Sequence, residues 1–248
     1  MSEARKTMLL LGGTSDIGRA VAAQYAAHGW NIILTARDVN AGERNAADLR
    51  VRHNANVRVL KFDLLRSEDH ASLLRALDTT PDTVVSTLGV LGDQTRAESD
   101  LAYAREILTA NFEGPALLLG LFAGQMAKRG TGTIVGISSV AGDRGRATNY
   151  VYGSAKAGFT AFLSGLRNRL ASSGVHVLTV KPGFVRTKMT EGMKLPPALT
   201  AEPEEVGRRV YRAAEVKKTD LIYVRPVWRL VMAIIRNIPE ARFKRMKL

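Results

Sequence analysis

The chain has 248 residues, of which 46% are apolar and 24% charged, and its net charge is +13 because 36 Lys and Arg outnumber 23 Asp and Glu. This length and composition are typical of a globular α/β protein with one large domain or two small ones. The lack of cysteine excludes disulfide bonds and a thiolate nucleophile, and the four scattered histidines lack the spacing of metal ligands, so we expect no metal site.

Short apolar runs alternate with helical patterns along the chain. The predicted strands are 7–13, 31–35, 57–62, 83–87, 133–138, 175–180 and 221–224. The predicted helices are 16–28, 40–53, 68–77, 98–128, 152–172 and 203–216. This alternation predicts an α/β fold with a doubly wound, parallel, seven-stranded Rossmann-type sheet, formed by a single domain over residues 1–225. Residues 226–248 are predicted to form an amphipathic C-terminal helical tail.

The first predicted strand leads into a glycine-rich turn, Gly-Gly-Thr-Ser-Asp-Ile-Gly at 12–18. Glycines between a strand and a helix let the backbone approach a pyrophosphate, and the N-terminus of the helix offers free N–H groups. A tight turn needs glycine in any case, so the pattern is weak by itself. The predicted dinucleotide contacts are Gly12, Thr14, Ser15, Asp16, Ile17 and Gly18. Asp16 replaces the middle glycine of the G-x-x-x-G-x-G pattern, and we expect its carboxylate to cap the following helix.

Arg37 follows the end of the second predicted strand. Sites that prefer NAD usually place an acidic residue here, on the adenosine ribose hydroxyls. A guanidinium group suits a 2′-phosphate instead, so Arg37 predicts NADP(H) as the cofactor. Asp38 is the next residue and could neutralise Arg37, which would leave an ordinary surface arginine.

Ser139, Tyr152 and Lys156 are the candidate catalytic residues, at the end of the fifth predicted strand and the start of the next helix. Tyr152 and Lys156 are four residues apart, so they share one helix face. A nearby ammonium group favours the phenolate, and we expect it to lower the pKa of Tyr152 towards a useful acid–base range. A tyrosine and lysine at this spacing are common by chance, but their position after a strand that ends in serine makes the pattern more specific.

Taken in order, these motifs resemble the short-chain dehydrogenase/reductase family over nearly all of residues 7–224. The resemblance implies that Ser139, and not Ser138, binds a carbonyl oxygen, that Tyr152 donates the proton with Lys156 as its partner, and that Asn111 completes the catalytic set. It also implies cofactor contacts from Asp63, Leu64, Gly89, Pro182, Gly183, Val185 and Thr187, and from Tyr152 and Lys156. Members of the family usually form homo-oligomers. Residues 86–89, Ser-Thr-Leu-Gly, depart from the family's usual Asn-Asn-Ala-Gly and, with Asp16, indicate a side branch.

Segments 12–18, 88–93 and 228–239 look like those of one branch of the family, the decaprenylphosphoryl-2-keto-D-erythro-pentose reductases. That resemblance implies NADPH-dependent reduction of a keto group on a polyprenyl-phosphate-linked pentose, the second half of a ribose-to-arabinose epimerisation in cell-wall precursor synthesis. A separate flavin oxidase would supply the ketone. One alternative is a 3-oxoacyl-carrier-protein reductase or a generic carbonyl reductase with the same mechanism. The other is a non-catalytic NADP(H)-binding or membrane-docked module, which would have no need of a positioned proton donor.

Four basic residues flank the expected substrate pocket: Arg144, Arg146, Arg186 and Lys188. Such groups would hold the phosphate of an anionic ketone, unless they are only solvated loop charges. The segment 189–203 contains three prolines and is predicted to be a long loop that covers the substrate.

The last 24 residues, 225–248, contain seven basic residues, Lys247 among them, and one acidic residue. Their apolar residues, Trp228 included, alternate with arginine and lysine in a pattern that suits the surface of an anionic membrane. The alternative is a helix packed on its own domain or on a second subunit. No segment reaches the roughly 18 uninterrupted apolar residues of a membrane span. We therefore expect a cytoplasmic protein that could attach to the inner face of the cell membrane, and no nucleic-acid partner, because only 6% of residues are aromatic.

Overall fold

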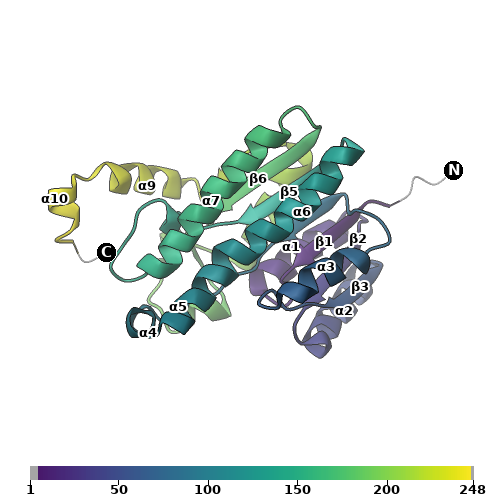
Figure 1. Ribbon diagram of the computed structural model, residues 1–248, viewed down its shortest axis with the longest axis horizontal. Coiled ribbons are helices and arrows are strands. Elements are labelled where there is room, and N and C mark those ends of the chain that lie inside the picture. Colours follow the sequence, from purple (N-terminus) through teal and green to yellow (C-terminus); the bar gives the residue numbers. More distant parts are fainter. Residues whose placement is uncertain (1–4, 247–248) are drawn as a thin grey trace.

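The computed structural model describes residues 5–246 as a parallel sheet between two layers of helices, with a C-terminal arm (Figure 1). Lys247, counted above among the basic tail residues, lies outside the described residues. The sheet has the order β3-β2-β1-β4-β5-β6-β9, and every neighbouring pair is parallel. Its strands are β1 (Thr7–Leu11), β2 (Asn31–Ala36), β3 (Val57–Lys61), β4 (Thr83–Ser86), β5 (Gly132–Ile137), β6 (Val175–Lys181) and β9 (Leu221–Tyr223). This confirms the predicted doubly wound, seven-stranded parallel sheet.

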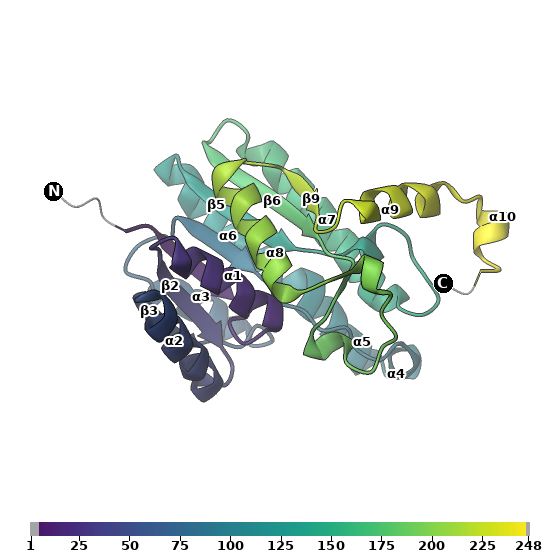
Figure 2. The same cartoon turned by 180° about the vertical axis from the view of Figure 1, so that it is seen from behind.

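Helices cover both faces of the sheet. The face seen in Figure 1 carries α3 (Ser67–Arg75), α6 (Gly114–Arg129) and α7 (Tyr150–Leu170), and the face seen in Figure 2 carries α1 (Asp16–Ala27), α2 (Val39–His53) and α8 (Pro203–Tyr211).

Two apolar cores follow from the pleat of the strands, because successive side chains point to opposite faces. Leu10 and Val85 belong to the core under α1 and α8. Their chain neighbours, Leu9 and Val84, belong to the core under α6 and α7. The strands therefore read as continuous apolar runs, as expected of a sheet that is buried on both sides.

The single helix predicted over 98–128 is confirmed from Leu101 onwards, but its predicted start is wrong, because a separate helix ends at Ser99. The chain forms α4 (Gln94–Ser99), α5 (Leu101–Leu108), a π-helical turn (Thr109–Glu113) and α6. Asp100 starts α5, because its carboxylate accepts a hydrogen bond from the backbone N–H of Tyr103 at 2.9 Å. In residues 5–246 the stretch Leu101–Arg129 is the one helix long and apolar enough to cross a membrane, but half of its most apolar window is buried inside the fold.

The predicted loop at 189–203 contains a little regular structure. Within it, β8 (Thr200–Ala201) pairs with β7 (Phe184–Val185), which ties the loop to the end of β6. After β9 the chain forms the arm, which consists of α9 (Val227–Asn237) and α10 (Glu240–Phe243). The arm extends beyond the end of α7 in both views (Figures 1 and 2).

Candidate active site

The glycine-rich turn lies between β1 and α1, where the order of strands in the sheet reverses, and this is the usual ligand site of such folds. Ser15, and not Asp16, caps α1: the Ser15 Oγ atom accepts a hydrogen bond from the backbone N–H of Gly18 at 3.0 Å. The expectation that the Asp16 carboxylate caps the helix is therefore wrong. Ser15 holds the cap because it precedes the first helical residue and has extended backbone dihedrals, whereas Asp16 is already inside the first turn.

Asp16 instead joins the turn to the segment after β7. One carboxylate oxygen accepts a hydrogen bond from the backbone N–H of Lys188 at 2.8 Å, and the other pairs with Arg19 at 2.6 Å. The middle position of the turn thus has a definite structural role here, because its side chain connects the dinucleotide-binding turn to the start of the predicted substrate loop.

Backbone crowding explains the glycines of the turn. A Cβ atom at Gly18 would lie 2.5 Å from the carbonyl oxygen of Gly12 and 2.7 Å from Ser15 Oγ. Gly12 has φ +94°, which favours glycine.

Thr87, at the end of β4, lies 3.1 Å from the Gly12 carbonyl oxygen and 3.0 Å from Ser15 Oγ. The departure from the usual family sequence at 86–89 therefore supplies a hydroxyl group that braces the turn.

A cavity of about 160 Å³ lies at the carboxyl ends of β4, β5 and β6. Ser139, Tyr152, Lys156 and Asn111 all line it, so the structure brings the four predicted catalytic residues together. Besides Tyr152 and Lys156, six of the predicted cofactor residues line the same cavity: Ile17, Gly89, Pro182, Gly183, Val185 and Thr187. A larger hollow of about 980 Å³ adjoins the glycine-rich turn and includes Asp16, Thr187 and Lys188 in its wall.

The two adjacent serines have different environments. Ser139 Oγ caps a short turn by accepting a hydrogen bond from the N–H of Ala141 at 3.1 Å, and this contact orients its hydroxyl group. Ser138 Oγ lies 2.6 Å from the Thr160 hydroxyl and donates to the Lys156 carbonyl oxygen at 3.0 Å. Because α7 already occupies the Ser138 hydroxyl, Ser139 is the serine available to a carbonyl oxygen.

Burial controls the ionisation of Tyr152 and Lys156. It raises the pKa of Tyr152 above the ordinary 10.0, and a hydrogen bond with Ser139 opposes this rise. It lowers the pKa of Lys156 to about 7, and the Lys156 ammonium donates a hydrogen bond to the Ile137 carbonyl oxygen at 3.2 Å. The predicted lowering of the Tyr152 pKa is therefore wrong: desolvation raises this pKa, and the effect that opposes the rise is the hydrogen bond with Ser139 and not the charge of Lys156.

The π-helical turn before α6 places Asn111 behind Lys156. Asn111 is fully buried, and its amide donates hydrogen bonds to the carbonyl oxygens of Val90 at 2.7 Å and Ile107 at 2.8 Å. Its Oδ1 atom is buried without a partner among residues 5–246. A Cβ atom at Gly89 would lie 2.5 Å from Oδ1 and 3.1 Å from Lys156 Nζ, so this glycine leaves room for both polar groups.

The chain matches known proteins over most of its length. It matches the short chain dehydrogenase family over residues 6–196. An uncharacterized oxidoreductase of Mycobacterium tuberculosis is 37% identical over 242 residues, which is 96% of each chain. A 3-oxoacyl-[acyl-carrier-protein] reductase of Aquifex aeolicus is 29% identical over 188 residues, which is 75% of this chain and 76% of the relative.

A solved structure from Beutenbergia cavernae superimposes with a TM-score of 0.83 at 25% identity, covering 92% of this chain and 98% of the other. That protein was proposed to be an NAD(P)-dependent gluconate 5-dehydrogenase, and NADP was bound to it at low occupancy. The chain belongs to the short-chain dehydrogenase family. Its predicted catalytic residues accordingly lie in a short-chain dehydrogenase fold, at the edge of the sheet where this arrangement of strands forms ligand sites.

The remaining predicted cofactor residues of this short-chain dehydrogenase follow the carboxyl ends of β2 and β3. Arg37 is exposed at the end of β2, and it forms no ion pair with any residue in 5–246. Asp38 caps α2 by accepting from the N–H of Ala41 at 3.1 Å, so its carboxylate is used by the helix. Asp63 Oδ1 accepts from the N–H of Leu65, and Leu64 is buried in the core after β3.

The four basic residues predicted for the substrate have different surroundings. Arg186 is exposed and pairs with Glu202 at 3.0 Å, and Lys188 is exposed beside the larger hollow. Arg146 lines the catalytic cavity. Arg144 does not line it; the guanidinium lies against the arm, with Nη1 2.8 to 3.1 Å from the carbonyl oxygens of Ile235, Arg236 and Ile238.

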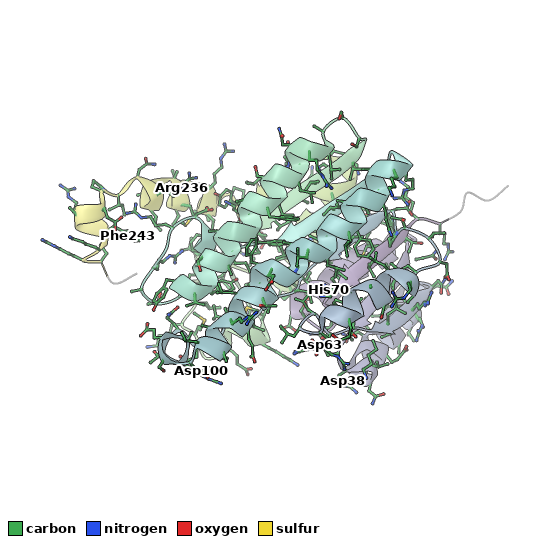
Figure 3. All side chains as sticks on the ribbon, in the orientation of Figure 1. Asp38, Asp63, His70, Asp100, Arg236 and Phe243 are labelled. Carbon is green, nitrogen blue, oxygen red and sulfur yellow. The ribbon has the colours of Figure 1, made fainter. Side chains whose placement is uncertain are left out.

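The same Arg144 guanidinium pairs with Glu240 at 2.6 Å and stacks over the ring of Phe243 at 3.9 Å. Arg144 therefore holds the exposed carbonyl groups at the end of α9, where a cation is favourable. Figure 3 shows Arg236 and Phe243 on the arm, at the opposite side of the molecule from Asp38 and Asp63.

Sequence reasoning missed the part of the cavity wall that the tail provides. Trp228 of α9 lines the cavity and packs directly on Gly183, and its Nε1 atom donates to the Leu199 carbonyl oxygen at 2.9 Å. Met189 and Met193 of the predicted loop also line it. The lone tryptophan of the tail was a usable signal, because a large apolar side chain in a basic segment must either pack on the domain or lie in a lipid surface.

Proposed function

We propose that this protein is an NADPH-dependent reductase that converts a ketone to a secondary alcohol. The observation that carries the proposal is the position of Ser139, Tyr152 and Lys156 around one buried cavity, next to the wall formed by Gly89 and Thr187. A protonated phenol, an oriented hydroxyl and a buried amine in one cavity form an acid–base site for a carbonyl oxygen.

In this mechanism NADPH, when bound, supplies a hydride to the carbonyl carbon of the substrate. Ser139 Oγ holds the carbonyl oxygen, and Tyr152 donates the proton that this oxygen takes up. The raised pKa of Tyr152 keeps the phenol protonated at neutral pH, as a reduction requires. Lys156, whose pKa is lowered to about 7, can pass a proton on to Tyr152 afterwards. The free Oδ1 atom of Asn111 can hold a water molecule that connects Lys156 to solvent.

The residues of the turn fit a dinucleotide. Gly12 and Gly18 keep side chains away from the approach to α1, and the N-terminus of α1 offers backbone N–H groups, of which the one at Gly18 is already bound by Ser15 Oγ. Arg37, which has no acidic partner in the described chain, suits the 2′-phosphate of NADP(H). NADP bound to the Beutenbergia cavernae protein, which has the same fold and 25% identity, supports this choice.

We infer that the ketone belongs to a polyprenyl-phosphate-linked pentose, with a flavin oxidase as the enzyme that makes it. The resemblance of segments 12–18 and 88–93 and of the tail supports this substrate, as does the basic character of Arg146, Arg186 and Lys188 near the site. A second candidate is the reduction of a 3-oxoacyl group on an acyl carrier protein. The similarity to the Aquifex aeolicus reductase, over three quarters of this chain, favours that candidate.

The test is NADPH oxidation with three substrates under the same conditions. They are a keto-pentosyl polyprenyl phosphate made in place by a flavin oxidase, a 3-oxoacyl carrier protein and a small neutral ketone. We expect kcat/KM to be highest for the lipid-linked sugar. Higher kcat/KM for the acyl carrier substrate would replace the first substrate by the second, and no NADPH oxidation with any of the three would reject the reductase.

We also propose that the arm rests on an anionic membrane surface. Trp228 and Met232 form the side of α9 that packs on the domain, but Leu230 and Ile234 on another side are 64% and 60% exposed. These two residues, together with the basic residues of the arm, make an apolar strip flanked by positive charge. A second subunit could cover the same strip, and homo-oligomers through α6 and α7 belong to the proposal as well.

A further inference from the structure

Among the described residues that line the catalytic cavity, Arg146 is the one charged residue that the proton chemistry does not use. It lies in the loop between the turn after Ser139 and the start of α7, and it lines the cavity beside Asn149 and Tyr152. Its Nε and Nη2 atoms are buried, and neither has a hydrogen-bond partner in the part of the chain that the structure describes. Arg144, two residues earlier, differs completely, because its guanidinium is fully engaged by the arm.

Arg146 is partly buried, and burying the Nε and Nη2 atoms of a guanidinium group without hydrogen-bond partners is energetically costly. Burial accordingly lowers the pKa of Arg146, and Asp143 is the one acidic residue whose charge opposes this effect. Asp143, however, is already bound by Lys181, and it accepts a hydrogen bond from Tyr223 at 2.7 Å. Arg146, which lines the cavity, therefore forms no ion pair among residues 5–246.

A second polar atom in the same wall is unsatisfied. Asn149 Oδ1 is buried without a partner in the described chain, and the backbone N–H of Asn149 donates to the Arg146 carbonyl oxygen at 3.1 Å, so both side chains come from one loop. Two unsatisfied polar side chains in one wall next to an acid–base group indicate a place for a polar ligand.

The position of Arg146 also separates two hollows. Besides the catalytic cavity, Arg146 lines a groove of about 250 Å³ between its own loop and the arm, where Phe243 and Met246 form the other wall. A group held by Arg146 would therefore lie between the reacting carbonyl and this groove.

We propose that Arg146 binds an anionic group of the ketone substrate, a phosphate or a carboxylate, and thereby makes the enzyme selective for charged ketones. Any larger part of the substrate beyond the anion leaves through the groove below the arm. This inference rests on the proposed reductase function. It adds which of the basic residues near the site recognises the charge, and the direction in which the rest of the substrate extends.

The kinetic test uses pairs of ketones that differ in charge: dihydroxyacetone phosphate with dihydroxyacetone, and acetoacetate with acetoacetamide. Loss of a charge-assisted hydrogen bond predicts that Arg146→Ala lowers kcat/KM for the charged member about 10- to 100-fold, mainly through KM, and changes the neutral member about twofold or less. Arg146→Lys should restore part of the loss, because it keeps the charge without the planar fork. Arg169→Ala, which removes an exposed arginine at the far end of α7, should change neither member.

A binding measurement gives a readout without turnover. With NADP+ at saturation, inorganic phosphate should raise the Tm of the wild type and of Arg169→Ala, but not that of Arg146→Ala.

Equal losses of kcat/KM for charged and neutral ketones in Arg146→Ala would mean a purely structural role and overturn the proposal. Phosphate stabilisation that is unchanged in Arg146→Ala would overturn it as well. If phosphate stabilises the wild type through Arg146 but no ketone is reduced, the anion site stands and the proposed reductase function fails. If both members of each pair are reduced equally well by wild type and Arg146→Ala, the reductase stands and the anion site fails.

Discussion

Tyr152 keeps its proton at neutral pH because burial raises its pKa, and the Ser139 hydroxyl lies in the same cavity to receive the substrate oxygen. Removing the phenol hydroxyl should therefore abolish proton donation and leave the fold intact. We expect Tyr152→Phe to lower kcat about 10²- to 10⁴-fold, with NADPH affinity within about twofold of wild type, as measured by cofactor fluorescence. Tyr211→Phe, a phenol on α8, is the matched control and should keep wild-type turnover. Turnover near wild type in Tyr152→Phe would reject its role as the proton donor.

Lys156 makes stability depend on pH at alkaline values. Burial depresses its pKa from 10.5 to about 7, so between these values the unfolded chain binds more protons than the folded chain. The desolvation cost is full below about pH 7 and is relieved as pH rises towards 10.5, which means that Lys156 makes the free energy of unfolding increase over this window.

Lys156→Met removes the titrating group and should flatten this part of the stability profile, measured by urea unfolding from pH 7 to 10. Lys128→Met, an exposed lysine in the last turn of α6, should keep the wild-type slope. The same slope in all three proteins would show that Lys156 is not the group responsible.

Among the elements, the arm depends most on one side chain of the domain. Arg144 is 15% exposed and contacts three carbonyl oxygens at the end of α9, as well as Glu240 and Phe243 of α10. Without it these carbonyl groups would lose their partner, whereas Trp228 would still pack on Gly183.

Arg144→Ala should therefore destabilise the arm by about 1.5–3 kcal/mol. Hydrogen exchange is the measurement: amide protons of α9 and α10 should exchange faster, while those of β5 and α7 keep their protection. Arg229→Ala, an exposed arginine of α9 itself, is the control and should leave exchange unchanged. Equal exchange in both variants would contradict the anchoring role.

Prediction of the elements succeeded where a local pattern determined them. The seven strands of the main sheet were placed to within two residues, because strands buried on both faces read as continuous apolar runs. The start of the long helix at 98–128 was misjudged because Asp100 interrupts a pattern that continues across it. Hydrogen bonds make Asp100 a helix cap and form the π-helical turn at Thr109–Glu113. The periodicity of apolar residues does not detect such hydrogen bonds.

On the scale of the whole molecule, the basic residues lie at separate sites: Arg37 after β2, Arg146 in the catalytic cavity and the basic residues of the arm.

The proposed membrane contact needs the exposed apolar strip of α9, Leu230 and Ile234. We expect the wild type to co-sediment with vesicles of phosphatidylglycerol and phosphatidylcholine, less so at high salt, and not with phosphatidylcholine alone.

The double substitution Leu230→Ser and Ile234→Ser removes the exposed strip and leaves the buried side of α9, with Trp228 and Met232, untouched. It should reduce co-sedimentation about tenfold or more, since each side chain contributes about 1.5–3 kcal/mol when buried in the lipid. A variant that binds vesicles like the wild type would reject the membrane contact. A change in oligomer mass without a change in vesicle binding would assign the strip to a second subunit.

The amino-acid sequence was sufficient for the sheet, the glycine-rich turn and the grouping of Ser139, Tyr152 and Lys156, because each depends on residues close in the chain or on the meeting of strand ends in a parallel sheet. Contacts between distant segments needed the folded structure. Asp16 reaches Lys188, Arg144 reaches the end of α9, and Arg146 lacks any such partner. The four basic residues near the site therefore look alike in the sequence. Only their burial and their partners distinguish Arg144, which holds the arm, from Arg146, which we propose binds the anionic group of the substrate.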